Sequence, residues 1–181
     1  MPEKIVTLMA TGSRGQVQPY VALGKGLQAA GIRVRLATAS SYASFVTEHG
    51  LEFHKIADVD AQSIAQSDEA KAIMATKDPL TLLRGVFSLI RPHFQESLDG
   101  MLTALDGASV GILNPLTQYG GYDACKKLGA KPVFSYVQSM IPMKKLPSAF
   151  VPPMPAIPGQ AVYNRLTHHI MLLLRSYNHN M

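Results

Sequence analysis

The residues best suited to chemistry lie in a short polar segment at positions 11–19, Thr-Gly-Ser-Arg-Gly-Gln-Val-Gln-Pro, which follows an apolar run. Gly12 and Gly15 let the backbone approach a ligand closely, and Ser13 and Arg14 offer a hydroxyl and a guanidinium. Open parallel sheets bind ligands beyond the carboxyl ends of their strands, and the N-terminus of a following helix favours negative charge. The segment is a candidate site for an anion or a hydroxyl group. A tight turn that binds no ligand is the alternative.

Three other kinds of site do not fit the sequence. A dinucleotide fingerprint needs G-x-G-x-x-G and an acid near the end of the second strand, but the spacing here is G-x-x-G and residues 37–40 contain no acid. A phosphate-binding NTPase loop needs a lysine and a hydroxyl residue after its last glycine, and Lys25 lies inside a predicted helix. No set of metal ligands is visible, because the adjacent His168 and His169 point in different directions on a helix.

The elements that must position the segment alternate between strand and helix, which is typical of a parallel sheet covered by helices. A helix is expected to begin at Gln18 and Pro19, with the proline near its first position, and to stop at Gly31. Pro92 is expected to kink or divide a long helix at 79–105. The expected strands are 4–10, 32–38, 51–57, 109–113 and 132–137, and the other expected helices are 40–49, 119–128 and 159–176. The pattern predicts an α/β fold with a doubly wound, Rossmann-like parallel sheet.

The last part of the chain differs in composition from the rest. Six prolines between positions 142 and 158 exclude a helix or a central strand there, so residues 138–158 are predicted to form a loop. Val162, Leu166, Ile170 and Leu173 recur at helical spacing in the final segment. The predicted organisation is a domain at 1–158 that includes this loop, followed by a C-terminal helix at 159–181.

Composition and charge narrow the class of protein. Hydrophobic residues make up 47% of the chain and charged residues 16%, which is typical of a packed globular protein. The single cysteine, Cys125, is interpreted as an inert packing residue and fits a reducing compartment. With no signal-peptide pattern at the N-terminus and no long apolar run, a cytoplasmic location is expected.

The net charge of +5 is concentrated towards the end of the chain. Residues 117–181 contain seven Lys or Arg and one acid, Asp123. Such a region attracts phosphate, either on an anionic membrane or on a nucleotide, and a solvated basic face is the alternative. No nucleic-acid partner is expected, because the basic residues form no recognisable module.

A family resemblance follows from specific residues. Positions 11–24, Thr-Gly-Ser-Arg-Gly-Gln-Val-Gln-Pro-Tyr-Val-Ala-Leu-Gly, resemble the opening of sterol and macrolide-type glycosyltransferases. Further stretches that agree are 29–38, 48–53, 120–122 and 163–168, with a looser match at 146–148. The chain is similar over nearly all its length to the N-terminal domain of glycosyltransferase family 28. This domain is one half of the GT-B arrangement, in which two Rossmann-like domains face each other across a cleft.

The resemblance implies a division of labour. The N-terminal domain holds the acceptor, and a C-terminal domain, absent from these residues, holds a nucleotide-diphosphate sugar as co-substrate, with no other cofactor and no metal. The loop of Gly12, Ser13, Arg14 and Gly15 matches the family's phosphate loop, with Ser13 near the donor phosphates. The family's catalytic base, typically aspartate, matches Gln16. A neutral amide cannot act as a general base, although it can orient a hydroxyl, and Asp123 is expected to be a solvated surface acid.

Acceptor contacts are expected mainly in the proline-rich loop. Its apolar side chains fit the wall of an acceptor pocket, and Lys144 and Lys145 suit anionic headgroups; packing on the sheet or on another domain is the alternative. The residues assigned to acceptor binding are Gln118, Gln138, Ser139, Met140 and Phe150.

The leading hypothesis is the acceptor-binding half of an inverting hexosyltransferase for a lipophilic hydroxyl, inactive by itself. Its expected partners are a hydrophobic small molecule and a donor domain that is missing or on another chain. The interpretation leaves open peripheral membrane contact and self-association through the apolar stripe of the last helix. Because Gln16 replaces the base, a non-catalytic lipid- or metabolite-binding module is the first alternative, and a truncated remnant is the second.

Overall fold

The computed structural model describes residues 5–58, 66–76, 79–138, 141–146 and 159–178. The chain divides into two compact units, Met1–Ser135 and Tyr136–Met181. The domain limits expected from the sequence, 1–158 and 159–181, stay a prediction. In chain order the elements are β1 (Ile5–Met9), α1 (Arg14–Ala29), β2 (Arg33–Thr38), the 3-10 turn η1 (Ser40–Tyr42), α2 (Ala43–Glu48), β3 (Glu52–Lys55), α4 (Asp68–Met74), α5 (Pro79–Ala104), β4 (Ala108–Leu113), α6 (Gln118–Leu128), β5 (Lys131–Phe134) and α7 (Gln160–Asn178).

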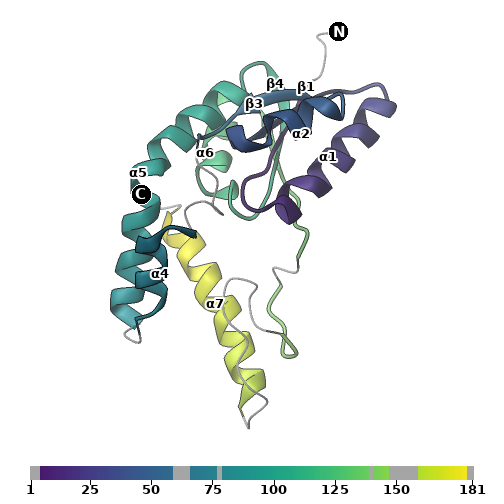
Figure 1. Cartoon of the computed structure of the whole chain (residues 1–181). Helices are drawn as coiled ribbons and strands as arrows, with labels where there is room; N and C mark the ends of the chain where they lie inside the picture. The colour runs from purple at the N-terminus through teal and green to yellow at the C-terminus, as the bar shows by residue number, and fades with distance from the viewer. Residues whose placement is uncertain (1–4, 59–65, 77–78, 139–140, 147–158, 179–181) are drawn as a thin grey trace. The chain divides into compact units, whose positions relative to one another are not determined.

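The first unit is built on a parallel sheet with strand order β3-β2-β1-β4-β5 (Figure 1). Every neighbouring pair runs parallel, with β1 between β2 and β4, so that Leu8 lies beside Leu36 on one side and Ile112 on the other. The chain adds strands outward from β1 in one direction and then returns to add β4 and β5 on the other side. This doubly wound α/β arrangement confirms the fold predicted from the sequence.

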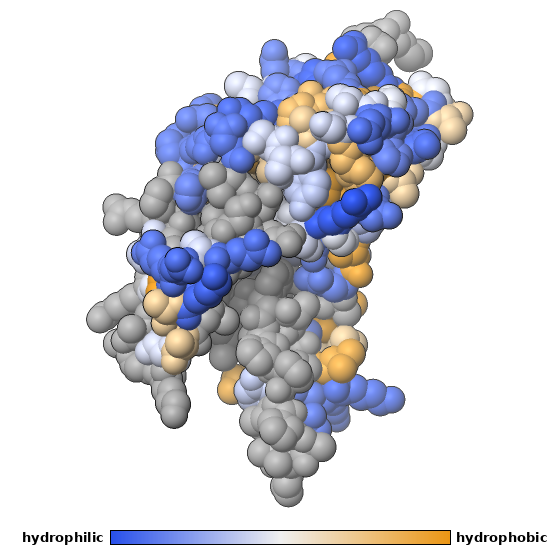
Figure 2. All heavy atoms as spheres, viewed as in Figure 1, coloured by the Kyte–Doolittle hydropathy of each residue, from blue (hydrophilic) through white to orange (hydrophobic). Residues whose placement is uncertain are grey.

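Alternation along the strands separates two hydrophobic cores. Even-numbered residues of β1 and β2 face α1 and α2, where Leu8, Val34 and Leu36 pack with Tyr20 and Val46. Odd-numbered residues face α5 and α6, where Met9 and Ala37 belong to a cluster with residues of these helices, including Met101, Ala104 and Cys125. Outside, Figure 2 shows mostly hydrophilic residues over this unit, with apolar residues gathered between them.

The first helix begins earlier than predicted. α1 starts at Arg14 rather than at Gln18, so Pro19 lies inside the helix. The backbone N–H groups of Gln16 and Val17 donate to the carbonyl of Ser13 at 2.8 and 3.2 Å, which closes the first turn before the proline is reached. Pro19 removes the hydrogen bond to the carbonyl of Gly15, but both residues are exposed, so water can satisfy that carbonyl.

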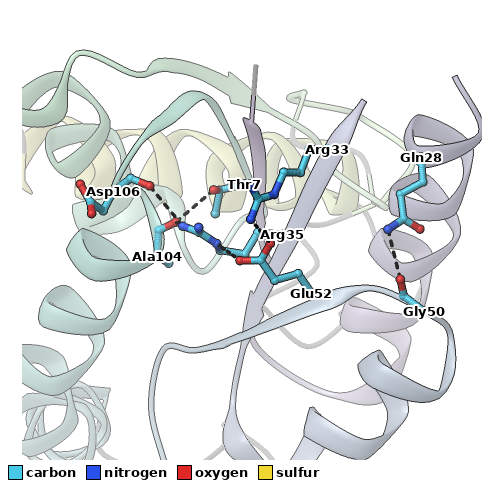
Figure 3. Close-up of polar contacts among 8 residues, drawn as sticks. All are labelled: Thr7, Gln28, Arg33, Arg35, Gly50, Glu52, Ala104 and Asp106. Carbon is cyan, nitrogen blue, oxygen red and sulfur yellow. Dashed lines mark hydrogen bonds and ion pairs between the residues drawn. The ribbon is translucent and has the colours of Figure 1, made fainter. Parts of the chain in front are cut away.

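The longest helix, α5, is not divided at Pro92, since helical geometry continues through it from Pro79 to Ala104. Its C-terminal end is tied to the sheet (Figure 3). The carbonyl of Ala104 accepts hydrogen bonds from Thr7 Oγ1 on β1 at 3.0 Å and from an Arg35 NH group on β2 at 2.7 Å. Arg35 also donates from Nε to Glu52 Oε1 at 2.8 Å. A guanidinium at this end satisfies the last carbonyls of the helix and favours its dipole.

The second unit contains α7, which confirms the helix expected near the C-terminus. Two residues of the predicted apolar stripe, Val162 and Leu166, are 71% and 55% exposed, which agrees with a stripe left open to contact, whereas Asn164, Thr167 and His168 are buried. Within the part of the chain that the structure describes, no helix is both long and apolar enough to cross a membrane.

The close approach of α5 to the end of β3 gives a prediction about stability. A Cβ added at Gly100 would lie 2.6 Å from the Cα of Ile56, so Gly100→Ala must displace backbone. We expect this change to lower the free energy of unfolding by about 2 kcal/mol or more, measured by urea denaturation. Gly26→Ala is the control, because a Cβ there meets nothing within 4 Å and should stabilise α1 by about 0.5–1 kcal/mol. Equal effects of the two changes would contradict the packing described for Gly100.

The Arg35–Glu52 pair predicts a pH dependence. The hydrogen bond from Arg35 holds the pKa of Glu52 below its ordinary value of 4.5. A depressed pKa adds stability above the unfolded value, and this contribution is lost as the pH falls through the folded value. Glu52→Gln should therefore reduce stability slightly at about pH 7 and hardly at all at about pH 3, in urea denaturation at both pH values. Glu48→Gln, on the exposed surface of α2, controls for loss of a negative charge. A loss that is the same at both pH values would contradict the assignment.

Candidate functional site

The candidate site lies where the strand order reverses. β1 and β4 are neighbours, but the connections that follow them lead to opposite sides of the sheet. In open parallel sheets this switch point is where ligands bind, beyond the carboxyl ends of the two strands. The segment predicted as a site, residues 11–16, follows β1, and a second turn, residues 114–117, follows β4.

The second turn holds the first through hydrogen bonds between residues about a hundred positions apart. Asn114 Nδ2 donates to the carbonyl of Thr11 at 2.7 Å, and Thr117 Oγ1 donates to the carbonyl of Met9 at 2.8 Å. Asn114 Oδ1 accepts from the backbone N–H groups of Leu116 and Thr117 at 3.1 and 2.8 Å, which closes the turn on itself. Asn114 and Thr117 are fully buried. The loop after β1 is therefore fixed in place by the start of the next connection.

Gly12 is required by its conformation and its surroundings. Its φ of +118° lies in a region that side chains disfavour, and a Cβ there would come 3.1 Å from Leu116 Cδ1 and 3.2 Å from Gln16 Cγ. Its carbonyl accepts a hydrogen bond from the Tyr42 hydroxyl at 3.2 Å. Gly12 is buried, so it shapes the loop and leaves ligand contact to the residues that follow it.

The exposed part of the loop is Ser13, Arg14 and Gly15. Ser13 is the N-cap of α1, but its side chain makes no capping hydrogen bond, and no acid lies in the first helical turn. The Arg14 guanidinium lies 4.6 Å from the ring centroid of Phe45 on α2. Helix N–H groups, a hydroxyl and a guanidinium thus meet at one exposed turn, which favours an anion electrostatically.

Gln16 lies at the inner edge of this turn. It is half-buried, and its Cβ and Cγ atoms lie against Gly12. An amide can donate and accept hydrogen bonds there, but it has no proton-accepting carboxylate. The position is suited to orienting a hydroxyl group close to the anion-favouring turn.

The other predicted residues are placed as follows. Gln118 is buried as the first residue of α6, and its backbone N–H donates to the carbonyl of Asn114 at 3.0 Å, so it adjoins the turn. Gln138 is half-buried in the second unit. Ser139, Met140 and Phe150 lie outside the described residues.

Residues given structural roles from the sequence behave accordingly. Asp123 is exposed on α6. Cys125 is buried, and burial raises the pKa of its thiol to about 11, so the thiol stays protonated and unreactive near neutral pH. Among the described residues, no three His, Cys, Asp or Glu side chains gather as metal ligands would.

Sequence reasoning missed the turn after β4. Asn-Pro-Leu-Thr at 114–117 directly follows an apolar strand, and Asn and Thr at this spacing are typical of side chains that cap a turn. That signal predicts a turn, but it does not show that the side-chain NH₂ group of Asn114 donates to the carbonyl of Thr11. Arg14 over Phe45 was missed for the same reason, since it joins residues on two separate helices.

The fold defines the class of protein. The calicheamicin glycosyltransferase CalG4 aligns with 98% of this chain and 43% of its own, with a TM-score of 0.59 at 11% identity. The glycosyltransferase SsfS6 of Streptomyces sp. SF2575, complexed with thymidine diphosphate, aligns with 93% of this chain and 43% of its own, with a TM-score of 0.55 at 16% identity. The first unit and the segment after it therefore share the fold of one half of a GT-B glycosyltransferase.

The family is narrower than the fold class. The model of the glycosyltransferase family 28 N-terminal domain matches residues 6–105, which include β1 from its second residue, the whole loop 11–16 and α5. The chain belongs to this family.

Two curated relatives agree with this assignment. A sterol 3-beta-glucosyltransferase of Debaryomyces hansenii is 33% identical over 164 residues, which cover 90% of this chain and 10% of the relative. The Saccharomyces cerevisiae enzyme of the same name is 39% identical over 80 residues, which cover 43% of this chain and 7% of the relative. The chain thus spans about a tenth of the length of the curated relatives that it matches.

The dual role of Asn114 gives a testable prediction. Asn114→Asp keeps an acceptor for the N–H groups of Leu116 and Thr117 but replaces the donor to Thr11 with oxygen. We expect a loss of about 2 kcal/mol or more in the free energy of unfolding near neutral pH, because a buried carboxylate then faces a carbonyl.

Burial beside a carbonyl should raise the folded pKa of the new carboxyl group, so stability should recover at acidic pH, where the protonated group can again donate to Thr11. Urea denaturation across pH measures this recovery. Thr117→Ser, which keeps the hydroxyl group that donates to Met9, is the control and should be tolerated. An Asp variant as stable as the original near neutral pH would contradict the hydrogen bond to Thr11.

Proposed function

We propose that these residues form the acceptor side of an inverting glycosyltransferase that moves a hexose from a nucleotide-diphosphate sugar to the hydroxyl of a lipophilic alcohol. The observation that carries the proposal is the loop of Ser13, Arg14 and Gly15, exposed at the switch point of a family 28 domain. The names of the curated relatives, sterol 3-beta-glucosyltransferases, support a sterol or a similar lipid as acceptor and glucose as the sugar.

The geometry of the site supports a role for the loop in binding both the diphosphate of the sugar donor and the hydroxyl of the acceptor. The N-terminus of α1, which has no side-chain capping hydrogen bond from Ser13 and no acid in its first turn, and the nearby Arg14 favour the negative charge of a diphosphate that approaches from outside. Gln16, at the inner edge of the same turn, would hydrogen-bond an acceptor hydroxyl. Inversion needs this hydroxyl to attack the sugar carbon from the face opposite the leaving diphosphate, so the sugar must lie between the acceptor hydroxyl and the diphosphate.

The donor side requires a second nucleotide fold. The five strands described here form one sheet, and the structural relatives are more than twice as long as the part that this chain matches. We propose that the donor domain is supplied by further sequence or by another chain, and that the 181 residues alone do not transfer sugar.

Gln16 favours a second candidate function, a non-catalytic module that binds a lipid or a metabolite. The chemistry is limited by proton removal, because an amide cannot take the proton of the acceptor hydroxyl as a carboxylate does. An enzyme with this glutamine must use a base from elsewhere or transfer slowly. A binding module needs no base, and Gln16 could then serve recognition alone.

One experiment tests the enzyme proposal and separates it from the alternative. The chain is joined to the donor-binding remainder of the Debaryomyces hansenii sterol 3-beta-glucosyltransferase, and glucosylated sterol is measured with UDP-glucose as donor. We expect Gln16→Asp to raise kcat by roughly 10²–10⁴-fold with little change in KM, because the variant gains a general base.

Gln18→Asp, an exposed position on the same helix, is the matched control and should leave kcat unchanged. If Gln16→Asp gives no transfer to any of a panel of sterols and polyketide alcohols while the chain still binds one of them, the binding-module alternative is favoured. Transfer by the isolated 181 residues would contradict the proposed division between acceptor and donor domains.

A further inference from the structure

Residues 141–146, Ile-Pro-Met-Lys-Lys-Leu, form a segment of the second unit with an unusual exposed composition. Ile141 and Leu146 are 73% and 59% exposed, and Lys144 and Lys145 are exposed between them. Figure 2 has the same view as Figure 1, and it shows hydrophobic residues next to hydrophilic ones where Figure 1 draws this segment. Transfer of large aliphatic side chains out of water is favourable, so an apolar environment that covers these two, within six residues of each other, would bind the segment.

The segment is held by its backbone to α7. Asn164 Nδ2 donates to the carbonyl of Lys144 at 2.8 Å, and His168 Nε2 lies 3.2 Å from the carbonyl of Leu146. Asn164 is fully buried and His168 is 3% exposed. Both hydrogen bonds use main-chain carbonyls, so the segment keeps its place while the side chains of Lys144 and Leu146 remain exposed. These contacts also explain why α7 turns polar residues inward.

The charge of this unit is wholly basic. Four of the 17 Lys and Arg residues and none of the 12 Asp and Glu residues lie in Tyr136–Met181, so the unit carries +4 of the net charge of +5. Lys144, Lys145 and Arg165 are exposed. Two copies of such a surface repel each other, which disfavours self-association through it. The surface is complementary to one that is negatively charged outside and apolar beneath.

We propose that residues 141–146 dock the protein on an anionic lipid bilayer. Ile141 and Leu146 enter the boundary between headgroups and acyl chains, while Lys144 and Lys145 contact lipid phosphates. Two lysines and two aliphatic side chains give a weak and reversible contact, which lets the protein move between bilayer and water. The proposal needs no acceptor and no sugar donor, so it stands independently of the proposed function.

Vesicle flotation of the full 181-residue chain tests the proposal with phosphatidylcholine vesicles, with and without phosphatidylserine. The chain should float with the anionic vesicles, and high salt should weaken this binding. Lys144→Gln with Lys145→Gln should lower affinity for them about 30-fold, because each lysine near the surface contributes about a factor of five. Lys144→Arg with Lys145→Arg should keep the affinity, and Ile141→Asn should lower it about tenfold.

A matched control lies in the first unit. On α6, Leu128 is 42% exposed and follows Lys126 and Lys127, so this site has the same residue types in another place. Lys126→Gln with Lys127→Gln should leave vesicle binding unchanged. Circular dichroism checks that each variant is folded.

Three results would overturn the proposal. The first is an original chain that does not float with anionic vesicles. The second is an equal loss for the two lysine pairs, since binding would then reflect net charge rather than this segment. The third is a chain that is dimeric by size-exclusion chromatography with light scattering and becomes monomeric through Ile141→Asn with vesicle binding unchanged, since a second copy would then cover the segment.

Discussion

The parallel pairing of β4 with β1 is the constraint on which the rest of the structure depends. It joins two strands that are about a hundred residues apart in the sequence. It also fixes which residues meet at the amino and at the carboxyl ends of these strands. At the amino ends of the strands, it places the C-terminus of α5 where Thr7 and Arg35 donate hydrogen bonds to the carbonyl of Ala104. At the carboxyl end it places Asn114 and Thr117 beside the loop after β1. A shift of register by one residue would exchange the two faces of β4 and separate both sets of groups.

The loop after β1 owes its shape to buried groups and its chemistry to exposed ones. Gly12 adopts a backbone conformation that other residues disfavour. The side-chain amide of Asn114 donates a hydrogen bond to the carbonyl of Thr11, the residue before Gly12. Because these hydrogen bonds fix the backbone of the loop, the N-terminus of α1 is exposed at Ser13, Arg14 and Gly15 without rearrangement. Such preorganisation is what a site for a charged leaving group requires, because donors that are already aligned cost little when charge develops. Gln16 is neutral, so it leaves this electrostatic arrangement in place.

The two units use polar residues in opposite ways. In the first, buried Thr7, Asn114 and Thr117 satisfy carbonyls at strand and helix ends, and apolar residues fill the two cores. In the second, buried Asn164 and His168 bond the carbonyls of a neighbouring segment, and apolar residues such as Val162 and Ile141 are exposed. An exposed apolar face held in place by buried hydrogen bonds is consistent with a surface that binds a partner. Because this unit contains no acids, the charge of that surface is positive.

The sequence alone determined the class of fold, the order of strands and helices, the family and the loop 11–16, because these depend on local periodicity, glycine positions and a contiguous motif. It erred where the local hydrogen bonds outweigh the position of a proline: α1 begins at Arg14 because the turn at Ser13 closes before Pro19. Only the tertiary structure decided which residues support the loop. The bonds from Asn114 to Thr11 and from Thr117 to Met9, and the stacking of Arg14 on Phe45, join elements that are distant in the chain. Such contacts arise from strand order and register, which no single stretch of sequence encodes.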